Sequence, residues 1–244
     1  MFISSVIFSW DAHIETSSYT GDDWRHSYSY LGHSDKLLSD FCEKHYLIDA
    51  ISNLKRAVDH RIKHISTIYK IKKTISYLAK KNIWNTLAEL ELIKPVMLGK
   101  LIQIRNAVEH HFSDPPTQDS CMELAEFVWY FLRSTDSIAQ RVSGGPYLQE
   151  SYDSLYIVAY KGTPHNEWES TISAHLAGSL TSLSPRENYF EVTDATVQTG
   201  YDYKVTNSGS PFLSDYRDDD VILNGKIKDR NVEMWFLRLY FRTT

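Results

Sequence analysis

Five polar residues of types that handle phosphate lie close together at the end of an apolar segment. They are Arg105, Asn106, Glu109, His110 and His111, and a Pro-Pro pair follows shortly after them. An Arg guanidinium stays charged and pairs with phosphate oxygens through two hydrogen bonds. A His imidazole titrates near neutral pH and can move a proton during a reaction. The segment is therefore the first candidate for an active site that handles phosphate.

The residues before this cluster predict the helix that must carry it. Pro95 suits the first turn of a helix, and Asp114-Pro115-Pro116 should end it. At about 100° per residue, Asn106 and His110 share a helix face, whereas Arg105 lies about 140° away from His110. We therefore expect either that the helix loosens before Pro115 or that Arg105 of one subunit meets His110 of another.

Further helices are predicted between residues 34 and 142, with apolar residues spaced by three and four positions. The first helix signals are at Ser34-Asp35, a plausible N-cap, and a long amphipathic helix should cover Tyr46 to about Ile71. Asn82 should cap a shorter helix, and the last should run from about Asp119 to Gln140. Four main helices joined by short connections predict an antiparallel four-helix bundle.

After Ser143-Gly144-Gly145-Pro146, the likeliest domain boundary, the pattern changes to short strands. We expect strands at 155–160, 168–173, 189–193 and 201–205, a hairpin turned by Asn224-Gly225, and a long final strand over 232–241. The sequence thus predicts an α+β protein with an N-terminal strand and loop (1–33), a helical domain (34–142) and an antiparallel β-sheet or small β-barrel domain (147–244).

Charge is unevenly distributed along the 244 residues, although the net charge is only -5. Residues 51–110 contain twelve Lys and Arg against four Asp and Glu. This basic region permits a polyanionic partner, although a solvated helix face rich in Lys is an equal alternative. The residues that we single out as candidates for binding a phosphate backbone are Lys55, Arg56, Arg61 and Lys63.

Cysteine content and hydropathy indicate a cytoplasmic protein with no membrane partner. Cys42 and Cys121 are far apart in the chain and are expected to be buried thiols. No apolar run reaches the roughly 18 residues that span a bilayer. The first ten residues lack a basic region and a cleavage site, and they resemble a strand more than a signal peptide.

The order Arg105-Asn106-Ala107-Val108-Glu109-His110 in the third of four helices resembles the Arg-Asn-x3-His motif of the HEPN superfamily. The resemblance covers about residues 35–140. It implies an endoribonuclease that needs no metal and no cofactor, and whose homodimer brings two motifs together. In this chain Arg105 would bind the scissile phosphate, and His110 would act as acid or base. Asn106 would orient either His110 or the phosphate.

The same resemblance implies a prokaryotic toxin or anti-phage system, with RNA as the substrate and a protein partner such as an antitoxin. Lys55, Arg56, Arg61 and Lys63 would then contact RNA, with Glu109 and His111 in supporting positions. The alternative is a non-catalytic dimerisation or nucleic-acid-binding module whose β domain performs the recognition. In that case Arg105 only pairs with Glu109, and His110 only stabilises the helix C-terminus.

One more pair of residues has a spacing that would allow both to bind one metal ion. His60 and His64 are four positions apart on the long helix, but no Cys or carboxylate completes a ligand pattern. We interpret both as surface histidines and expect no metal.

Overall fold

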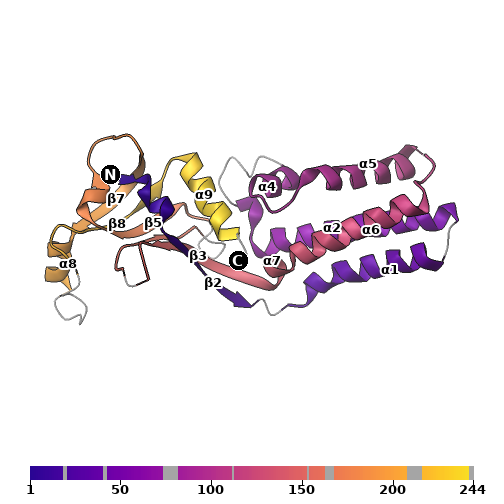
Figure 1. Cartoon of the computed structure of the whole chain (residues 1–244), viewed down its shortest axis with the longest axis horizontal. Coiled ribbons are helices and arrows are strands. Elements are labelled where there is room, and N and C mark those ends of the chain that lie inside the picture. The colour runs from indigo at the N-terminus through magenta and orange to yellow at the C-terminus, as the bar shows by residue number, and fades with distance from the viewer. Residues whose placement is uncertain are drawn as a thin grey trace. The chain divides into compact units, whose positions relative to one another are not determined.

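The chain folds into two compact units, shown in a computed structural model (Figure 1). One unit is Ser18–Val142, and the other combines Met1–Ser17 with Ser143–Arg242. The first is mainly helical and the second contains most of an eight-stranded sheet, so the protein is α+β as predicted. The structure describes residues 1–18, 21–40, 43–73, 82–111, 113–152, 154–162, 168–207 and 216–241.

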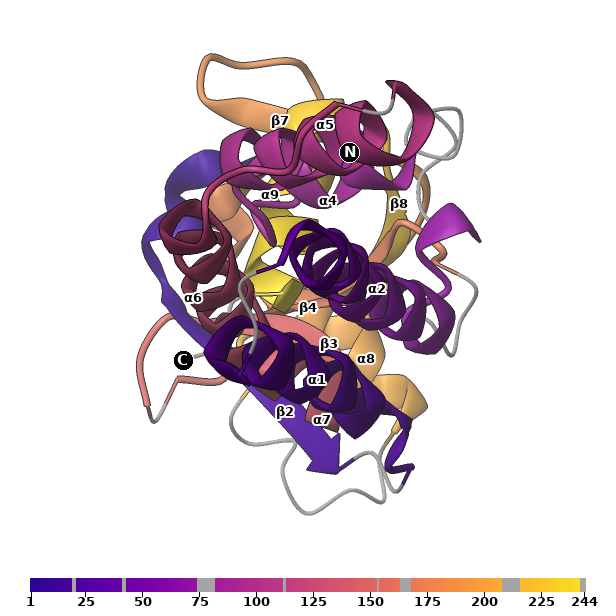
Figure 2. The ribbon, with the colours of Figure 1, turned by 90° about the vertical axis from the view of Figure 1, so that its right-hand side faces the viewer.

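The helical unit is arranged around its longest helix, α2. This helix contacts α1, α5, α6 and α7, and Figure 2 shows it between α1 and α5. Its buried side chains recur at the three- and four-residue spacing of one helix face, as the sequence predicted. The helices are α1 (His26–Asp40), α2 (Lys44–Ile68), α4 (Ile83–Glu89), α5 (Pro95–His111), α6 (Gln118–Ser134) and α7 (Asp136–Gln140), with short 3-10 helices η2 (Asp23–Arg25) and η3 (Ile71–Lys73).

Side-chain caps begin two of these helices. Asn82 accepts a hydrogen bond from the Asn85 amide at the start of α4, which confirms the predicted cap. Thr117 accepts one from the Ser120 amide at the start of α6. The expected cap at Ser34 is wrong, because α1 already begins at His26. The Ser34 hydroxyl is buried and donates to the carbonyl of Ala50 at 2.9 Å, so this residue joins α1 to α2.

A buried cation lies among these helices. Arg61 on α2 is fully buried and donates to the carbonyl of Leu132, to Thr135 Oγ1 and to Asp136 Oδ1, the last at 2.9 Å. Its guanidinium also lies over the ring of Tyr28, whose hydroxyl donates to the other carboxylate oxygen of Asp136. Burial and this bond to the carboxylate raise the pKa of Tyr28. One side chain thereby connects α1, α2 and the α6–α7 junction.

The second unit is built on an open antiparallel sheet with the strand order β2-β3-β4-β5-β8-β7-β1-β6. The N-terminal β1 pairs with both β6 and β7, so the start of the chain is part of this sheet. The prediction of a sheet holds, and that of a barrel does not. The strands are β1 (Phe2–Ser4), β2 (Asp11–Ser18), β3 (Arg141–Gln149), β4 (Ile157–Tyr160), β5 (Thr171–Leu176), β6 (Thr181–Ser182), β7 (Tyr189–Thr199) and β8 (Val221–Ile227), with 3-10 helices η1 (Ser5–Ser9) and η5 (Gly178–Leu180).

Two expected strands are helices. Residues 201–205 lie in α8 (Gly200–Thr206), which is capped by the Thr199 side chain. Residues 232–241 lie in α9 (Arg230–Phe241), where Asp229 accepts hydrogen bonds from the first amides. A short run that is apolar on all sides suits a buried strand or a buried helix equally well, and the Asp229 cap decides for the helix.

The expected hairpin at Asn224-Gly225 is also wrong, because both residues lie inside the continuous strand β8. A Cβ atom on Gly225 would come within 2.4 Å of Val192 Cγ1 and 3.0 Å of the Thr193 carbonyl. Strand β7 shifts its register with β8 between Thr193 and Thr196. Gly225 therefore provides space for the close approach of an irregular neighbouring strand, one of the known uses of glycine within sheets.

The α9 helix covers part of this sheet with aromatic side chains. Phe236 is stacked on Tyr160 of β4 with 5.1 Å between ring centroids, and Trp235 contacts Phe8 of η1 at 4.7 Å. Burial raises the pKa of Tyr160. Offset stacking of this kind adds to the free energy gained from burying the rings.

Among the described residues, no helix combines the length and the apolar character that crossing a membrane requires.

Replacing Arg61 should reveal its role in stability. Arg61→Ala leaves the Asp136 carboxylate and two backbone or hydroxyl acceptors without their buried donor. Removing one partner of a buried ion pair lowers the free energy of unfolding by about 3–5 kcal/mol, because the other charge stays buried without its partner. We expect the free energy of unfolding, measured by urea denaturation and circular dichroism, to fall by this amount. Arg56→Ala, an exposed change on the same helix, is the control, and an equal loss in both variants would contradict this role.

Candidate functional site

Helix α5 brings Arg105 and His110 together within one chain. Arg105 Nη1 lies 2.9 Å from His110 Nε2, and α5 remains an α-helix as far as His111. The expectation that one regular helix keeps Arg105 and His110 apart is therefore wrong, because this contact needs neither a loosened helix nor a second subunit. A meeting of Arg105 with His110 of another subunit stays a prediction. The angle describes the Cα positions, whereas the long Arg side chain reaches around the helix surface to the ring.

A carboxylate completes the cluster. Glu109 forms an ion pair with Arg105 Nη2, and its other oxygen accepts a hydrogen bond of 2.6 Å from Ser52 Oγ on α2. Arg105 Nη1 also donates to Asn106 Oδ1 at 3.2 Å. The guanidinium is thus surrounded by Asn106, Glu109 and His110, and Ser52 fixes the carboxylate from the neighbouring helix. We call Ser52, Arg105, Asn106, Glu109 and His110 the Arg105 cluster.

The contact between Arg105 and His110 determines where the imidazole carries its proton. A guanidinium can only donate, so His110 Nε2 must accept and cannot hold a proton. The neutral ring then carries its hydrogen on Nδ1. The lone pair of Nε2 is engaged by Arg105, so it can take a proton from a nearby hydroxyl only after the guanidinium moves to another acceptor, such as a phosphate.

The cluster is accessible to a ligand. The side chains of Arg105 and Glu109 are 30% and 25% exposed, and His110 and His111 are exposed on the last turn of α5. Asn106, which shares a helix face with His110, bonds to Arg105 instead of orienting the ring. His111 lies beside the cluster but has no hydrogen bond to it among the contacts of the described residues.

Three of the four residues predicted to bind a phosphate backbone are on the outside of α2. Arg56 and Lys63 are exposed, and Lys55 is partly exposed and pairs with Asp59. Arg61 is not available to RNA, because it is buried in the interactions described above, and its prediction is corrected. Its spacing was the missed signal: Arg61 falls three and four positions after Val58 and Ala57, in the apolar series of the helix.

The interpretation of His64 as a surface residue is also wrong. His64 is buried, and its Nε2 lies 3.1 Å from the carbonyl of Ala139. Burial lowers the pKa of His64 and of His60, and the charge of His26 lowers that of His60 further. Rings of His26 and His60 are 5.5 Å apart at their centroids. Across the part of the chain that the structure describes, no three His, Cys, Asp or Glu residues are grouped to hold a metal.

The described cysteine is as inert as expected. Cys121 is buried, and burial raises the pKa of its thiol to about 11. A thiol that stays protonated at neutral pH is a poor nucleophile. Cys42 lies outside the described residues.

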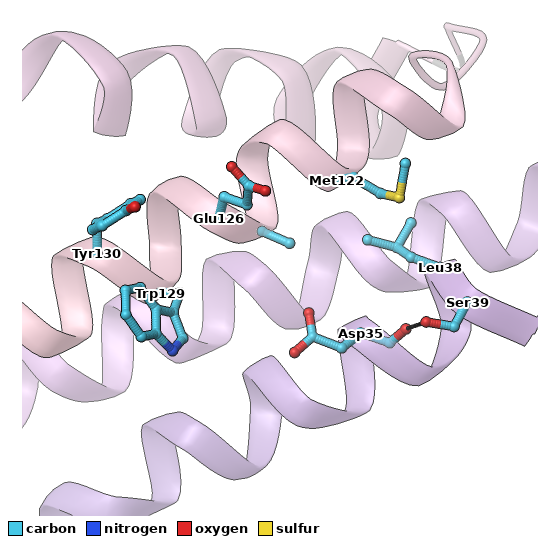
Figure 3. Close-up of a pocket in the computed structure, with 8 residues that line it drawn as sticks. Asp35, Leu38, Ser39, Met122, Glu126, Trp129 and Tyr130 are labelled. Atoms are coloured by element: carbon cyan, nitrogen blue, oxygen red, sulfur yellow. Dashed lines mark hydrogen bonds between the residues drawn. The ribbon is translucent and has the colours of Figure 1, made fainter.

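A hollow of about 450 Å³ lies between α1 and α6, away from every predicted site residue (Figure 3). Asp35 on α1 and Trp129 on α6 point into the space between the helices, and burial raises the pKa of Asp35. Its carboxylates, Asp35 and Glu126, would repel a phosphate group. This hollow is therefore unsuited to a polyanion. Its lining consists of Asp35, Leu38, Ser39, Met122, Ala125, Glu126, Trp129 and Tyr130.

The hydrogen bond to Arg105 gives a prediction for the tautomer of His110. At neutral pH we expect its proton on Nδ1, visible as the pattern of long-range proton–nitrogen couplings in NMR spectra of 15N-labelled protein. Arg105→Ala removes the donor, so the Nε2–H form should then increase. His33, exposed on α1, should not change. A wild-type His110 already protonated on Nε2 would contradict the contact.

Comparison with models of known protein families gives no match for this sequence, and comparisons with curated proteins and with solved structures give none either.

Proposed function

We propose that the protein is an endoribonuclease of the HEPN type that cleaves RNA without a metal ion and works as a homodimer. One observation carries the proposal: the guanidinium of Arg105 and the Nε2 of His110 lie 2.9 Å apart on an accessible helix end. The motif resemblance suggests a prokaryotic toxin or anti-phage function in the cytoplasm, with a protein partner controlling the activity. The helical unit, with four long helices, is compatible with a HEPN-like bundle.

In the proposed reaction, the ribose 2′-hydroxyl attacks the adjacent phosphorus. His110 Nε2 takes the hydroxyl proton as the new O2′–P bond forms. The P–O5′ bond breaks, and the leaving oxygen receives this proton from the imidazolium that His110 has become. The products are a 2′,3′-cyclic phosphate and a 5′-hydroxyl. Neither an oxidant nor a co-reactant is needed.

Arg105 would provide the positive charge for this reaction. Its guanidinium can donate two hydrogen bonds to the non-bridging phosphate oxygens and stabilise the charge that develops there. To do so it must exchange at least His110 for the phosphate, because Nε2 cannot accept from Arg105 and take the hydroxyl proton at the same time. Ser52 would keep Glu109 in place during this exchange.

The ion pair that Arg105 already forms with Glu109 favours a second candidate function. Glu109 already neutralises Arg105, and Ser52 holds that carboxylate, so the cluster could simply fasten α5 to α2. The protein would then be a non-catalytic dimerisation or nucleic-acid-binding module, with the β-sheet unit recognising the ligand. The two candidates differ in what substitutions of Arg105, Glu109 and His110 do.

Cleavage of RNA tests the first candidate. Purified protein incubated with total RNA in the presence of EDTA should produce fragments ending in 2′,3′-cyclic phosphate. His110→Ala and Arg105→Ala should each lower the rate by about 10²- to 10³-fold, as expected for losing a proton carrier or a charge stabiliser. The measurement is the fragment yield over time on a denaturing gel, with end-group analysis.

His33→Ala and Arg186→Ala are matched controls, because they remove an exposed His and an exposed Arg elsewhere. A 2′-deoxy substitution at the cleaved nucleotide should block cleavage there. If cleavage survives both Arg105→Ala and His110→Ala, the proposed roles are ruled out.

The substitution Glu109→Gln separates the two candidates. It removes the negative charge that competes with a phosphate for Arg105. An ion pair this exposed contributes about 0.2–1 kcal/mol, so affinity for RNA should rise by up to about fivefold. Fluorescence anisotropy in a His110→Ala background measures it, with Glu126→Gln on α6 as the control of equal charge change. Unchanged affinity together with lower stability would favour the purely structural function.

A further inference from the structure

A basic hollow lies at the other end of α2 from the Arg105 cluster. Its volume is about 630 Å³, and its lining combines three lysines, two hydroxyl residues and an aspartate with the apolar side chains of Ile62, Ile83 and Trp84. We call Lys63, Ser66, Thr67, Lys70, Lys73 and Trp84 the Lys63–Trp84 groove. Its acidic lining residue, Asp59, is already engaged by Lys55. The net charge of this surface is therefore positive.

The local backbone brings these side chains to one place. Helix α2 ends at Ile68, and Lys70 adopts a left-handed conformation with φ of 45°. The chain turns there into η3, where the Lys73 amide donates to the Lys70 carbonyl at 2.7 Å. This turn carries Lys70 and Lys73 back to the same hollow as Lys63, and α4 adds the half-buried ring of Trp84.

The composition of the groove fits a nucleotide better than a simple anion. Ammonium groups attract phosphates, and the face of an indole stacks on a base regardless of its identity. A second hollow, of about 450 Å³, shares Lys63 and Thr67 with the groove and adds His60 and Tyr30, whose ring centroids are 6.2 Å apart. Lysines and aromatic rings thus line two hollows that share residues, as on surfaces that bind single strands, and Asp23 adds one carboxylate to the second hollow.

Helix geometry links the groove to the Arg105 cluster. Ser52 and Lys63 are eleven residues apart on α2, which places them within about 20° of the same direction and about 17 Å apart along the axis. Arg56 lies between them on the exposed side of the helix. A stacked single strand advances about 3.4 Å per nucleotide, so about five nucleotides cover this distance.

We propose that the Lys63–Trp84 groove binds single-stranded RNA, with phosphates at the lysines and a base stacked on Trp84, about five or more nucleotides from the bond that is cleaved. This inference deepens the proposed function and rests on it, because the bound strand is the one that reaches Arg105 and His110. Double-stranded RNA should bind less well, since its bases are not free to stack on an indole.

The test is fluorescence anisotropy with a labelled 12-nucleotide single-stranded RNA, in a His110→Ala background that prevents cleavage. Trp84→Ala should weaken binding by about 5- to 150-fold, corresponding to 1–3 kcal/mol of stacking, and Trp84→Phe should retain much of the affinity. The pair Lys63→Ala with Lys70→Ala should lower the slope of log affinity against log salt by about 1.4. A four-nucleotide RNA should bind less tightly than the 12-mer.

Matched controls are available on the same unit. Trp129→Ala removes an exposed tryptophan from the α1–α6 hollow, and Lys36→Ala with Lys94→Ala removes two exposed charges. None of these should change the affinity or the salt slope. Circular dichroism checks that the Trp84 variants fold. If Trp84→Ala does not fold, the double variant of Lys63 and Lys70 still tests the groove.

The outcomes distinguish the groove from the nuclease. If the lysine pair and Trp84→Ala both bind RNA like the parent, or if the parent does not bind it, the groove proposal is overturned, whatever the cleavage assay shows. If groove variants lose RNA affinity while the native protein leaves RNA intact, the groove stands and the nuclease does not. Equal affinity for double-stranded RNA would overturn the stacking of a base on Trp84.

Discussion

The buried ion pair between Arg61 and Asp136 is the interaction on which the helical unit depends. A buried guanidinium is costly unless it is paired and hydrogen-bonded. The two terminal nitrogens of Arg61 find acceptors on α6, at the α6–α7 junction and in η2, whereas its buried Nε has no partner among the described residues. This requirement is directional, whereas the apolar contacts around it are not. It therefore fixes α2 both along its axis and around it, relative to α6 and α1.

A fixed α2 in turn positions both candidate sites. At its N-terminal half Ser52 holds Glu109, and through it Arg105, on α5. At its C-terminal end Lys63 faces the hollow that Trp84 closes on another side. The proposed chemistry and the proposed recognition are therefore placed by the same helix. A change in the Arg61 network would disturb both of them without touching either.

Much of the helical unit could be predicted from the sequence, because its spacing, the Asn82 cap and the prolines around α5 are local signals. The α+β class followed in the same way. Residues 232–241 could not be assigned, since an apolar run of that length fits either element until the Asp229 cap is weighed. The hairpin prediction at Asn224-Gly225 was wrong because Asn-Gly is locally a turn signal. The role of Gly225 is tertiary, since the missing side chain makes room for Val192 of the neighbouring strand.

The candidate site shows the same division between local and tertiary signals. The residue types in Arg105-Asn106-x3-His110 were sufficient to choose the segment, but helix angles alone gave the wrong geometry for its two main residues. The length of the Arg105 side chain makes the contact with His110 possible, and the spacing of residues along a helix carries no information about that length. Ser52 could not be found from sequence, because a single serine on a long helix gives no sign of the carboxylate it will meet. Arg61 was visible in the apolar series of α2 and was misassigned.

The left-handed conformation of Lys70 has a consequence for evolution and engineering. A residue with a Cβ atom in this conformation costs about 1–2 kcal/mol relative to its relaxed state, and glycine avoids most of that cost. A search for stabilising substitutions would therefore favour glycine at this position. That same change would delete a cation from the groove, so position 70 is one where thermal stability and ligand binding are expected to oppose each other.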